Sequence, residues 1–229
     1  MLTFNHRTAL ITGAGRGIGK AIAETLAQQG VTVICVSKSA ESCGATAAAI
    51  IAAGGKAKAL AVDVADGAAI AKASEELLKE FPAIDILVNN AGITRDGLLF
   101  RMSESDWSDV IGTNLTSCFH WTKLIGRPMT RARWGRIVNI GSASARAGQP
   151  FLAAYSASKA ALSTLTRNSG FALMRNRVRV NQLDIGWMLS DHEKKIQLVE
   201  SGDPDWQAKA EAGLPFGRLL DPEEVARAV

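Results

Sequence analysis

A glycine-rich segment near the start of the chain has the residue types and spacing of a phosphate-binding turn. It reads Thr-Gly-Ala-Gly-Arg-Gly-Ile-Gly over residues 12–19 and lies between a strand-like apolar run and a helical one. Glycine lets the backbone turn sharply and lets a phosphate approach without meeting a Cβ atom, and a helix N-terminus offers N–H groups to an anion. The segment therefore predicts a dinucleotide site that uses Gly13, Arg16, Gly17, Ile18 and Gly19.

A second group of residues combines a phenol, a cation, a hydroxyl and an amide. Tyr155 and Lys159 are four residues apart at the start of a predicted helix, so their side chains share one face of it. Ser142 ends a predicted strand 13 residues before the tyrosine, and Asn114 lies in the helix that precedes that strand. A tyrosine and a lysine at this spacing are common by chance. Their occurrence with Ser142, Asn114 and the glycine turn makes the four residues a candidate catalytic group.

The elements that must position these residues alternate between strands and helices. Strand-like apolar runs cover residues 8–12, 31–36, 56–62, 84–88, 135–140 and 178–183. Helical runs cover about 17–29, 41–53, 66–81, 105–127 and 155–174. Strands that are apolar on both faces are typical of a parallel sheet covered by helices, and the repeated order predicts right-handed crossovers. We expect an α/β fold in a single domain, a Rossmann-type doubly wound parallel sheet flanked by helices.

The composition of the 229 residues excludes several other classes of protein. With 47% apolar residues the chain is too apolar to be disordered, and no window approaches 18 uninterrupted apolar residues, so no membrane span is expected. Cys35, Cys43 and Cys118 lack metal-ligand spacing and are typical of buried thiols in a reducing compartment, so we expect no metal site and a cytoplasmic location. The sequence pI near 9.1 comes with no recognisable nucleic-acid-binding module, so no nucleic-acid partner is expected.

The end of the second predicted strand distinguishes the two nicotinamide cofactors. NAD sites usually place an acid there to hold the ribose 2′-hydroxyl. This chain has Ser37-Lys38-Ser39 instead and no acid before Glu41, and Arg16 adds a second cation. A cationic, hydroxyl-rich pocket suits a 2′-phosphate, so Ser37 and Lys38 favour NADP(H), with NAD(H) as the alternative.

These motifs together resemble the short-chain dehydrogenase/reductase family. The glycine turn, Asp63-Val64, the stretch from Asn89 to Gly92, Asn114, Ser142 and the Tyr-Ser-Ala-Ser-Lys stretch at 155–159 occur in the family's order and spacing between residues 8 and about 183. The resemblance implies an oxidoreductase that moves hydride between a nicotinamide and a carbonyl carbon. A dinucleotide-binding regulator without catalysis is the alternative of another class, but such a protein has no use for all four residues of the catalytic group.

The resemblance also implies a role for each residue of the catalytic group. Tyr155 would give a proton to the alkoxide, and Lys159 would lower the pKa of that phenol from its usual value near 10 and hold the nicotinamide ribose. Ser142 would hydrogen-bond the carbonyl oxygen. Asn114 would hold a water molecule that relays protons through the lysine.

By the same matching, further cofactor contacts lie at the ends of other strands. Asp63 and Val64 should contact the adenine. The cleft beside the nicotinamide should be lined by Asn90, Ala91, Gly92, Tyr155, Lys159 and Gly186. Ile185 stands where the family usually has proline, so the backbone before Gly186 lacks a fixed φ and is expected to take a different path.

The substrate is less closely defined by the sequence. Residues 89–99 and 139–142 look most like 3-oxoacyl-[acyl-carrier-protein] reductases. Arg133 lies where such reductases commonly have a basic residue, and Asn176 where a second is expected, so an acyl carrier protein is a candidate partner beside a small-molecule substrate. The aromatic and polar residues of the lid at 187–218 suit a polyhydroxylated substrate about as well, which leaves a sugar or polyol dehydrogenase as the alternative. His192 in that segment is expected to be exposed, because the mechanism needs no histidine.

The resemblance also concerns the assembly and the end of the chain. Members of the family are commonly homotetramers built on the two long helices that begin near residues 105 and 155, and we expect the same here. Residues 221–226 resemble the helix that precedes the family's last strand. We therefore expect the single catalytic domain of residues 1–229 to lack that strand and the tail that follows it.

Overall fold

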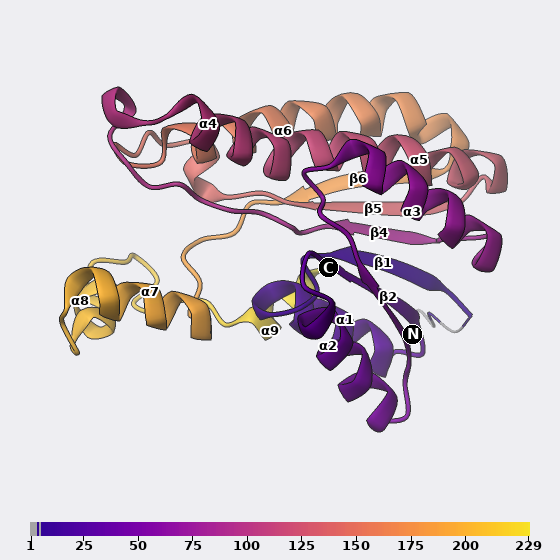
Figure 1. Cartoon of the computed structure of the whole chain (residues 1–229), viewed down its shortest axis with the longest axis horizontal. Coiled ribbons are helices and arrows are strands. Elements are labelled where there is room, and N and C mark those ends of the chain that lie inside the picture. Colours follow the sequence, from indigo (N-terminus) through magenta and orange to yellow (C-terminus); the bar gives the residue numbers. More distant parts are fainter. Residues whose placement is uncertain (1–3, 5) are drawn as a thin grey trace.

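A six-stranded parallel sheet forms the centre of the molecule (Figure 1), a computed structural model that describes residue 4 and residues 6–229. The strand order is β3-β2-β1-β4-β5-β6, and every neighbouring pair is parallel. The strands are β1 (Thr8–Thr12), β2 (Thr32–Ser37), β3 (Lys56–Ala61), β4 (Ile86–Asn89), β5 (Gly135–Ile140) and β6 (Val178–Leu183). The order reverses between β1 and β4, and a crevice at the carboxyl ends of two such strands is where doubly wound sheets bind ligands.

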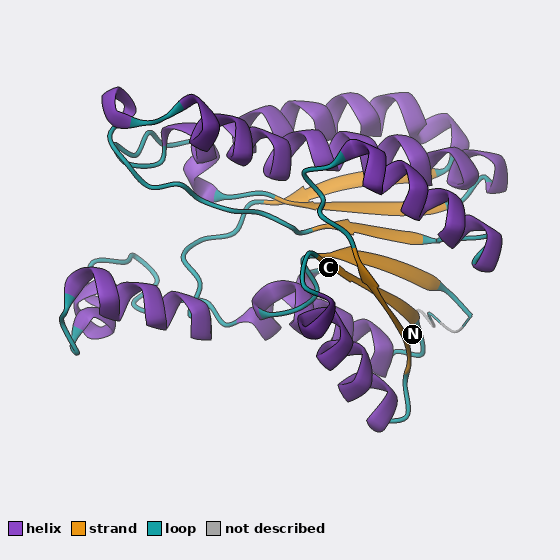
Figure 2. Ribbon diagram, in the orientation of Figure 1, coloured by secondary structure: helices purple, strands orange, loops and turns teal. Residues whose placement is uncertain are grey.

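Helices cover both faces of this sheet, as Figures 1 and 2 show. The layer above it in Figure 1 contains α3 (Gly67–Glu80), α4 (Glu104–Ile111), α5 (Ser117–Ala132) and α6 (Ala153–Leu173). The layer below it contains α1 (Gly17–Gln28), α2 (Ala40–Ala52) and α9 (Pro222–Ala228). The helices α7 (Asp191–Ser201) and α8 (Trp206–Ala212) lie beside these layers, at the left of the view.

Alternate residues of the central strand pack into two separate apolar cores. Ala9 and Ile11 of β1 belong to the core shared with α1, α2 and α9, whereas Leu10 belongs to the core shared with α3 and α5. All three side chains are fully buried. Both faces of the strand are therefore apolar because both are covered, which confirms the predicted α/β sheet.

The predicted helix over residues 105–127 differs from the structure in two ways. Residues Gly112–Thr116 form a π-helical turn that separates α4 from α5. The helix also continues past Arg127 and through Pro128 to Ala132. A proline inside a helix removes the single hydrogen bond that its own N–H would donate, and the other residues of α5 remain helical to the left-handed cap at Arg133.

The described residues also bear on the compositional expectations. All three cysteines are buried and free, as predicted. Among the described residues, no helix has both the length and the apolar character needed to cross a membrane. In the same part of the chain, no group of three or more His, Cys, Asp or Glu side chains is arranged to hold a metal ion.

Candidate active site

Most of the predicted site residues follow the carboxyl ends of strands. Gly13 comes directly after β1, Lys38 after β2, Asn90 after β4, and Asp63 and Ser142 two residues after β3 and β5. Because the strands are parallel, these positions meet at one edge of the sheet. The remaining members of the predicted catalytic group come from the π-helical turn and from α6.

The structure brings Asn114, Tyr155 and Lys159 together at this edge. A Cβ atom added to Gly92 would lie 3.5 Å from both Asn114 Oδ1 and Lys159 Nζ. Lys159 Nζ lies 5.6 Å from the centre of the Tyr155 ring and donates to the carbonyl of Ile140 at 2.7 Å. The glycine therefore keeps open a space that a side chain would fill between the amide and the ammonium group.

The pKa of the Tyr155 phenol is raised above its ordinary value of 10, chiefly because burial disfavours the phenolate. A hydrogen bond with the Ser142 side chain acts in the opposite direction, and the Asp96 carboxylate raises the pKa further. The expected lowering by Lys159 is therefore absent from this arrangement. The lysine is itself buried, and desolvation lowers its pKa from the ordinary value of 10.5.

Asn114 is fully buried and fixed by three hydrogen bonds. Its Oδ1 accepts from the N–H of Ile93 at 2.9 Å, and its Nδ2 donates to the Ile93 carbonyl at 2.9 Å and to Ser158 Oγ at 3.1 Å. The side chain thus ties the π-helical turn to the loop after β4 and to α6. Single π-helical turns are frequent at functional sites. Neither this turn nor the Ser158 contact was predictable from the sequence pattern.

Ser142 lies at the junction between β5 and the short 3₁₀ turn Ala143–Ala145. Its Oγ lies 2.9 Å from Ser144 Oγ and accepts from the Ser144 N–H at 3.2 Å. Ser144 is buried and was not predicted from the sequence as a site residue. The sequence signal for Ser144 is that its hydroxyl occurs two residues after that of Ser142.

The glycine turn between β1 and α1 needs glycine for several different reasons. Gly13 and Gly17 have φ values of +67° and +53°, in the left-handed region that side chains rarely adopt. A Cβ atom at Gly19 would lie 2.2 Å from the carbonyl oxygen of Gly13, and one at Gly15 would lie 2.3 Å from Ser42 Oγ. No described side chain caps the N-terminus of α1, so its first N–H groups point to a site suited to a pyrophosphate.

Asn90 and Thr12 hold the end of β4 against the end of β1. Thr12 Oγ1 accepts from the N–H groups of Asn90 and Ala91, both at 3.0 Å. Asn90 Nδ2 donates to the Thr12 carbonyl at 2.9 Å. A Cβ atom at Gly13 would lie only 2.8 Å from that Nδ2, so the asparagine also packs against the glycine turn.

Lys38 and Asp63, predicted to contact different parts of the cofactor, form an ion pair with each other. Lys38 Nζ lies 2.7 Å from Asp63 Oδ2, and the two side chains are 80% and 40% exposed. Their hydrogen bond raises the pKa of the lysine and lowers that of the aspartate. Ser37 Oγ donates to the Ser39 carbonyl at 2.7 Å, and Val64 is buried. All four residues lie at the carboxyl ends of β2 and β3.

The loop before Gly186 runs beside the segment that contains Ser142. The Leu183 carbonyl accepts from Gly141 N–H at 2.7 Å, and the Ile185 carbonyl accepts from Ala143 N–H at 2.9 Å. Ile185 therefore continues the pairing of β5 with β6 beyond the ends of the strands. The absence of proline leaves this backbone pairing in place.

The lid formed by α7 and α8 is anchored at both ends. Trp187 Nε1 donates to Glu193 Oε1 at 2.7 Å, and the rings of Trp187 and Trp206 lie 6.4 Å apart. Residues 187–189 pair with Leu220, and Ser190 Cβ lies 3.9 Å from a Cβ position at Gly17. The start of the lid therefore adjoins the glycine turn, which makes Ser190 a site residue that the sequence analysis missed. The side chain of His192 lies outside the described residues.

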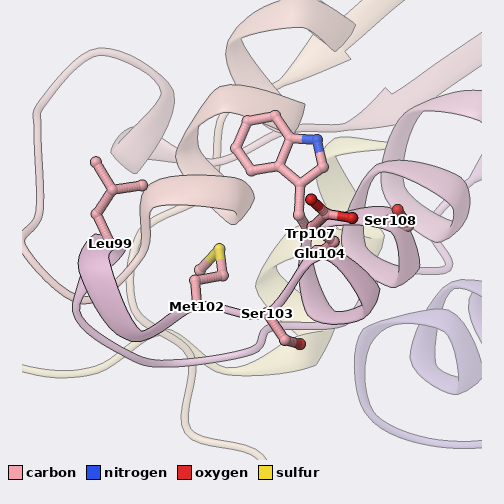
Figure 3. A pocket seen from close by; sticks show the side chains of 6 residues that line it. All are labelled: Leu99, Met102, Ser103, Glu104, Trp107 and Ser108. Atoms are coloured by element: carbon pink, nitrogen blue, oxygen red, sulfur yellow. The ribbon is translucent and has the colours of Figure 1, made fainter.

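A hollow of about 330 Å³ lies where the 3₁₀ turn Leu99–Arg101 meets α4 (Figure 3). Its lining consists of Leu99, Met102, Ser103, Glu104, Trp107 and Ser108. None of the four residues of the catalytic group lines it. The hollow and the catalytic group therefore share no lining residue.

Comparisons with known proteins agree with this geometry. The family model described as short chain dehydrogenase matches residues 7–200. A 3-oxoacyl-[acyl-carrier-protein] reductase of Vibrio harveyi is 40% identical over 228 residues, which cover 100% of this chain and 90% of that protein. The protein of the same name from Escherichia coli K12 is 39% identical with the same coverage.

Solved structures of similar proteins share the whole fold. A variant of the actinorhodin polyketide ketoreductase with NADPH has a TM-score of 0.92 at 31% identity, covering 100% of this chain and 90% of that one. A protein from Beutenbergia cavernae, assigned as an NAD(P)-dependent gluconate 5-dehydrogenase and crystallised with NADP, has a TM-score of 0.90 at 33% identity, covering 99% and 89%. The chain belongs to the short-chain dehydrogenase family and is an oxidoreductase that interconverts a carbonyl and a secondary alcohol.

Proposed function

We propose that the protein is an NADP(H)-dependent reductase of 3-oxoacyl thioesters. The observation that carries the proposal is the meeting of Asn114, Tyr155 and Lys159 around Gly92, at the sheet edge that also holds Ser142 and the glycine turn. The substrate class is supported by the 40% identity, over the full chain, to a 3-oxoacyl-[acyl-carrier-protein] reductase. The cofactor supplies the hydride, and the residues of this chain supply binding, orientation and the proton.

Tyr155 is the proposed proton donor. Its raised pKa keeps the phenol protonated at neutral pH, which suits donation to an alkoxide during carbonyl reduction. Ser142 Oγ, which lies 2.9 Å from Ser144 Oγ and acts on the pKa of the phenol, would hold the substrate oxygen beside Tyr155. In the reverse direction the same phenol must first lose its proton, so alcohol oxidation is disfavoured at neutral pH.

Lys159 is the proposed anchor for the nicotinamide ribose. An ammonium group has three donors, and the Ile140 carbonyl accepts one of them. The others suit the ribose hydroxyls and a water molecule held near Asn114, whose Oδ1 faces the same space at Gly92. Because Asn114 is fixed by Ile93 and Ser158, its role is to orient that water and the backbone, and the proton would pass onward through Lys159.

The preference for NADP(H) is proposed from Lys38, Ser37 and Arg16. The Lys38–Asp63 pair is exposed and screened by solvent, so it contributes little to stability. A 2′-phosphate carries more negative charge than a single carboxylate and can take the lysine from it. Two of the solved relatives were crystallised with NADP or NADPH, which supports the same choice.

An acyl carrier protein is the proposed partner, at the amino ends of β5 and β6. Arg133 Nη2 donates to the Arg175 carbonyl at 3.2 Å, and Arg136 Nη1 lies 3.5 Å from the Arg177 carbonyl. These contacts gather four guanidinium-bearing residues around Asn176, a surface suited to an acidic protein. The partner named for the Vibrio harveyi relative supports this assignment.

The assembly and the location complete the proposal. Large apolar side chains are exposed on the helices expected to form the interfaces of a homotetramer, namely Phe119 on α5 and Phe171 on α6, which is 79% exposed. Light scattering after size-exclusion chromatography should give four times the chain mass of 24.2 kDa. The three buried free thiols fit the proposed cytoplasmic location.

A substrate panel tests the proposed activity. NADPH and NADH oxidation are followed with acetoacetyl thioesters, sugar ketones and simple ketones, and the highest kcat/KM is expected for the thioester with NADPH. A higher kcat/KM with a keto-sugar acid would favour the gluconate-type alternative, which the 33% identity to the Beutenbergia cavernae protein supports. Lys38→Ala should reduce the preference for NADPH over NADH. Arg133→Glu should weaken carrier-protein binding. Lys72→Glu, on the exposed face of α3, serves as the control for both variants.

A further inference from the structure

Asp184, which directly follows β6, has both carboxylate oxygens engaged by side chains. Its Oδ1 accepts from Gln182 Nε2 at 2.5 Å. Its Oδ2 accepts from Arg146 Nε at 3.3 Å and from Arg146 Nη2 at 3.2 Å. The aspartate side chain is 21% exposed, whereas that of Arg146 is 81% exposed. The carboxylate is therefore the fixed member of the pair, and the arginine reaches it from outside.

The pair joins two loops that flank the catalytic group. Arg146 follows the turn that begins at Ser142, and Asp184 precedes Ile185 and Gly186. Backbone hydrogen bonds already join these loops, from Gly141 to the Leu183 carbonyl and from Ala143 to the Ile185 carbonyl. The ion pair adds a connection at residue 146, beyond the last of these backbone contacts. It thus closes the turn that carries the Ser142 hydroxyl.

Gly141 shows that the backbone has made room for this carboxylate. A Cβ atom at Gly141 would lie 2.2 Å from Asp184 Oδ1 and 2.5 Å from Gln182 Nε2. Both distances are far inside van der Waals contact, so any larger residue at 141 would displace the aspartate. Figure 1 shows β5 and β6 side by side, with the two loops leaving the same end of the pair.

A buried polar network fixes the carboxylate from behind. Gln182 Oε1 lies 3.1 Å from Thr166 Oγ1, which accepts from Asn139 Nδ2 at 2.8 Å. Asn139 Oδ1 in turn accepts from Asn89 Nδ2 at 2.8 Å. Thr166, Asn139 and Asn89 are all buried, so the amide that holds Asp184 cannot rotate without breaking contacts inside the protein.

We propose that Asp184 and Arg146 are positioning residues that clamp the Ser142 loop onto the loop beside the nicotinamide. That second loop has Ile185 in place of proline, so its backbone φ angle is not fixed by a ring. The inference rests on the proposed function for its catalytic readout. The clamp acts through Ser142, because the Ser142 hydroxyl is placed by the turn whose far end Arg146 holds. Without the clamp the turn keeps its backbone contacts at residues 141 and 143 and loses its anchor at 146.

The carboxylate has a second effect that separates the two members of the pair. Lys159 faces Tyr155 on its own helix, Cys118 on α5 and Asp184 beyond β6, and the aspartate raises the pKa of the lysine. Asp184→Asn removes this negative charge and should lower the pKa of Lys159. The loss of activity with rising pH should therefore begin at a lower pH in this variant than in the wild type. Removing the Arg146 charge should not lower that pKa, because the aspartate is then less neutralised.

Steady-state kinetics of Asp184→Asn and Arg146→Gln test the clamp, with Glu75→Gln as control because its pair with Lys79 lies exposed on α3. Each variant should lower kcat by about 10- to 100-fold, as misplacement of a catalytic group does, with a smaller change in the KM for NADPH. The double variant should lose no more kcat than Asp184→Asn alone, because both substitutions remove the same contact. Asp184→Asn combined with Ile185→Pro should recover part of kcat.

Hydrogen exchange of peptides that cover residues 142–152 tests the same inference without any substrate. Asp184→Asn and Arg146→Gln should speed exchange there, and Glu75→Gln should not. If the wild type turns over no 3-oxoacyl thioester but exchange rises as expected, the proposed function fails and the clamp stands. Unchanged exchange, unchanged kcat or additive losses in the double variant would overturn the clamp, even if the melting temperature falls.

Discussion

Gly19→Ala is a stringent test of how the glycine turn is built. Gly19 lies in the first turn of α1, and an added Cβ atom would lie 2.2 Å from the Gly13 carbonyl oxygen and 2.5 Å from Asn90 Nδ2. The first of these atoms belongs to the backbone and cannot rotate away. The turn between β1 and α1 must therefore open, and this moves the N–H groups that are expected to hold a pyrophosphate.

The magnitude follows from these contacts. Forcing an extra carbon into a packed site costs about 1–3 kcal/mol, and a contact with a fixed carbonyl places this substitution near the upper end. For a chain of this length, about 3 kcal/mol corresponds to a fall of about 6–12 °C in Tm. NADPH affinity should fall as well, because the same movement displaces the N-terminus of α1.

Gly44→Ala is the matched control, because Gly44 lies within α2 and a Cβ atom there would meet nothing within 4 Å. Alanine is the better helix former by about 0.5–1 kcal/mol, so this variant should melt about 1–4 °C higher and bind NADPH normally. Thermal unfolding and quenching of protein fluorescence by NADPH measure both effects. A Gly19→Ala protein with wild-type Tm and NADPH affinity would refute the close approach of α1 to the turn.

Three further predictions concern the proton donor and the end of the chain. Tyr155→Phe should fold and bind NADPH with kcat lower by about 100- to 10,000-fold, measured by stopped-flow absorbance; retained turnover would reject the phenol as donor. Because the pKa of Tyr155 is raised, carbonyl reduction should stay active through neutral pH while alcohol oxidation rises as pH increases toward that pKa, and a flat oxidation profile would contradict this. A hydrogen bond from Arg218 lowers the pKa of Glu224 from 4.5 to about 2. This carboxylate therefore stabilises the fold above pH 4.5, and the stabilisation is lost as the pH falls toward 2. The Tm difference between the wild type and Glu224→Gln should shrink over that pH interval.

The parts of the fold that follow from local pattern were predictable from the sequence. Each strand is a run of apolar residues because helices cover both faces of the sheet, and such a run is visible without knowing its neighbours. The glycine turn was predictable for a similar reason, since the positive φ values at Gly13 and Gly17 favour glycine, and the glycines are visible in the sequence. The ends of the strands then fix which residues can meet.

The parts that depend on distant contacts were not predictable. The π-helical turn at Gly112–Thr116 interrupts an ordinary helical pattern, and its Asn114 is held by Ile93 and Ser158, which are 21 and 44 residues away. The direction in which the pKa of Tyr155 shifts was not predictable, because the sequence shows a neighbouring lysine but not the burial that raises this pKa. Lys38 was expected to bind a 2′-phosphate together with Ser37 and Arg16, and its pairing with Asp63 becomes visible only when β2 and β3 lie side by side.

Asp184 illustrates why this limit matters for function. In the sequence it is one acidic residue in a loop, followed by Ile185 where the family usually has proline. Nothing in the local sequence distinguishes it. The register of β5 and β6 pairs Ile140 with Leu183, so the next residue of each chain segment is Gly141 on one side and Asp184 on the other. A carboxylate can occupy that position only because its neighbour is glycine. A Gly141→Ala substitution should therefore damage the wild type more than it damages an Asp184→Ala protein, and equal losses of kcat in the two backgrounds would show that the glycine has another purpose.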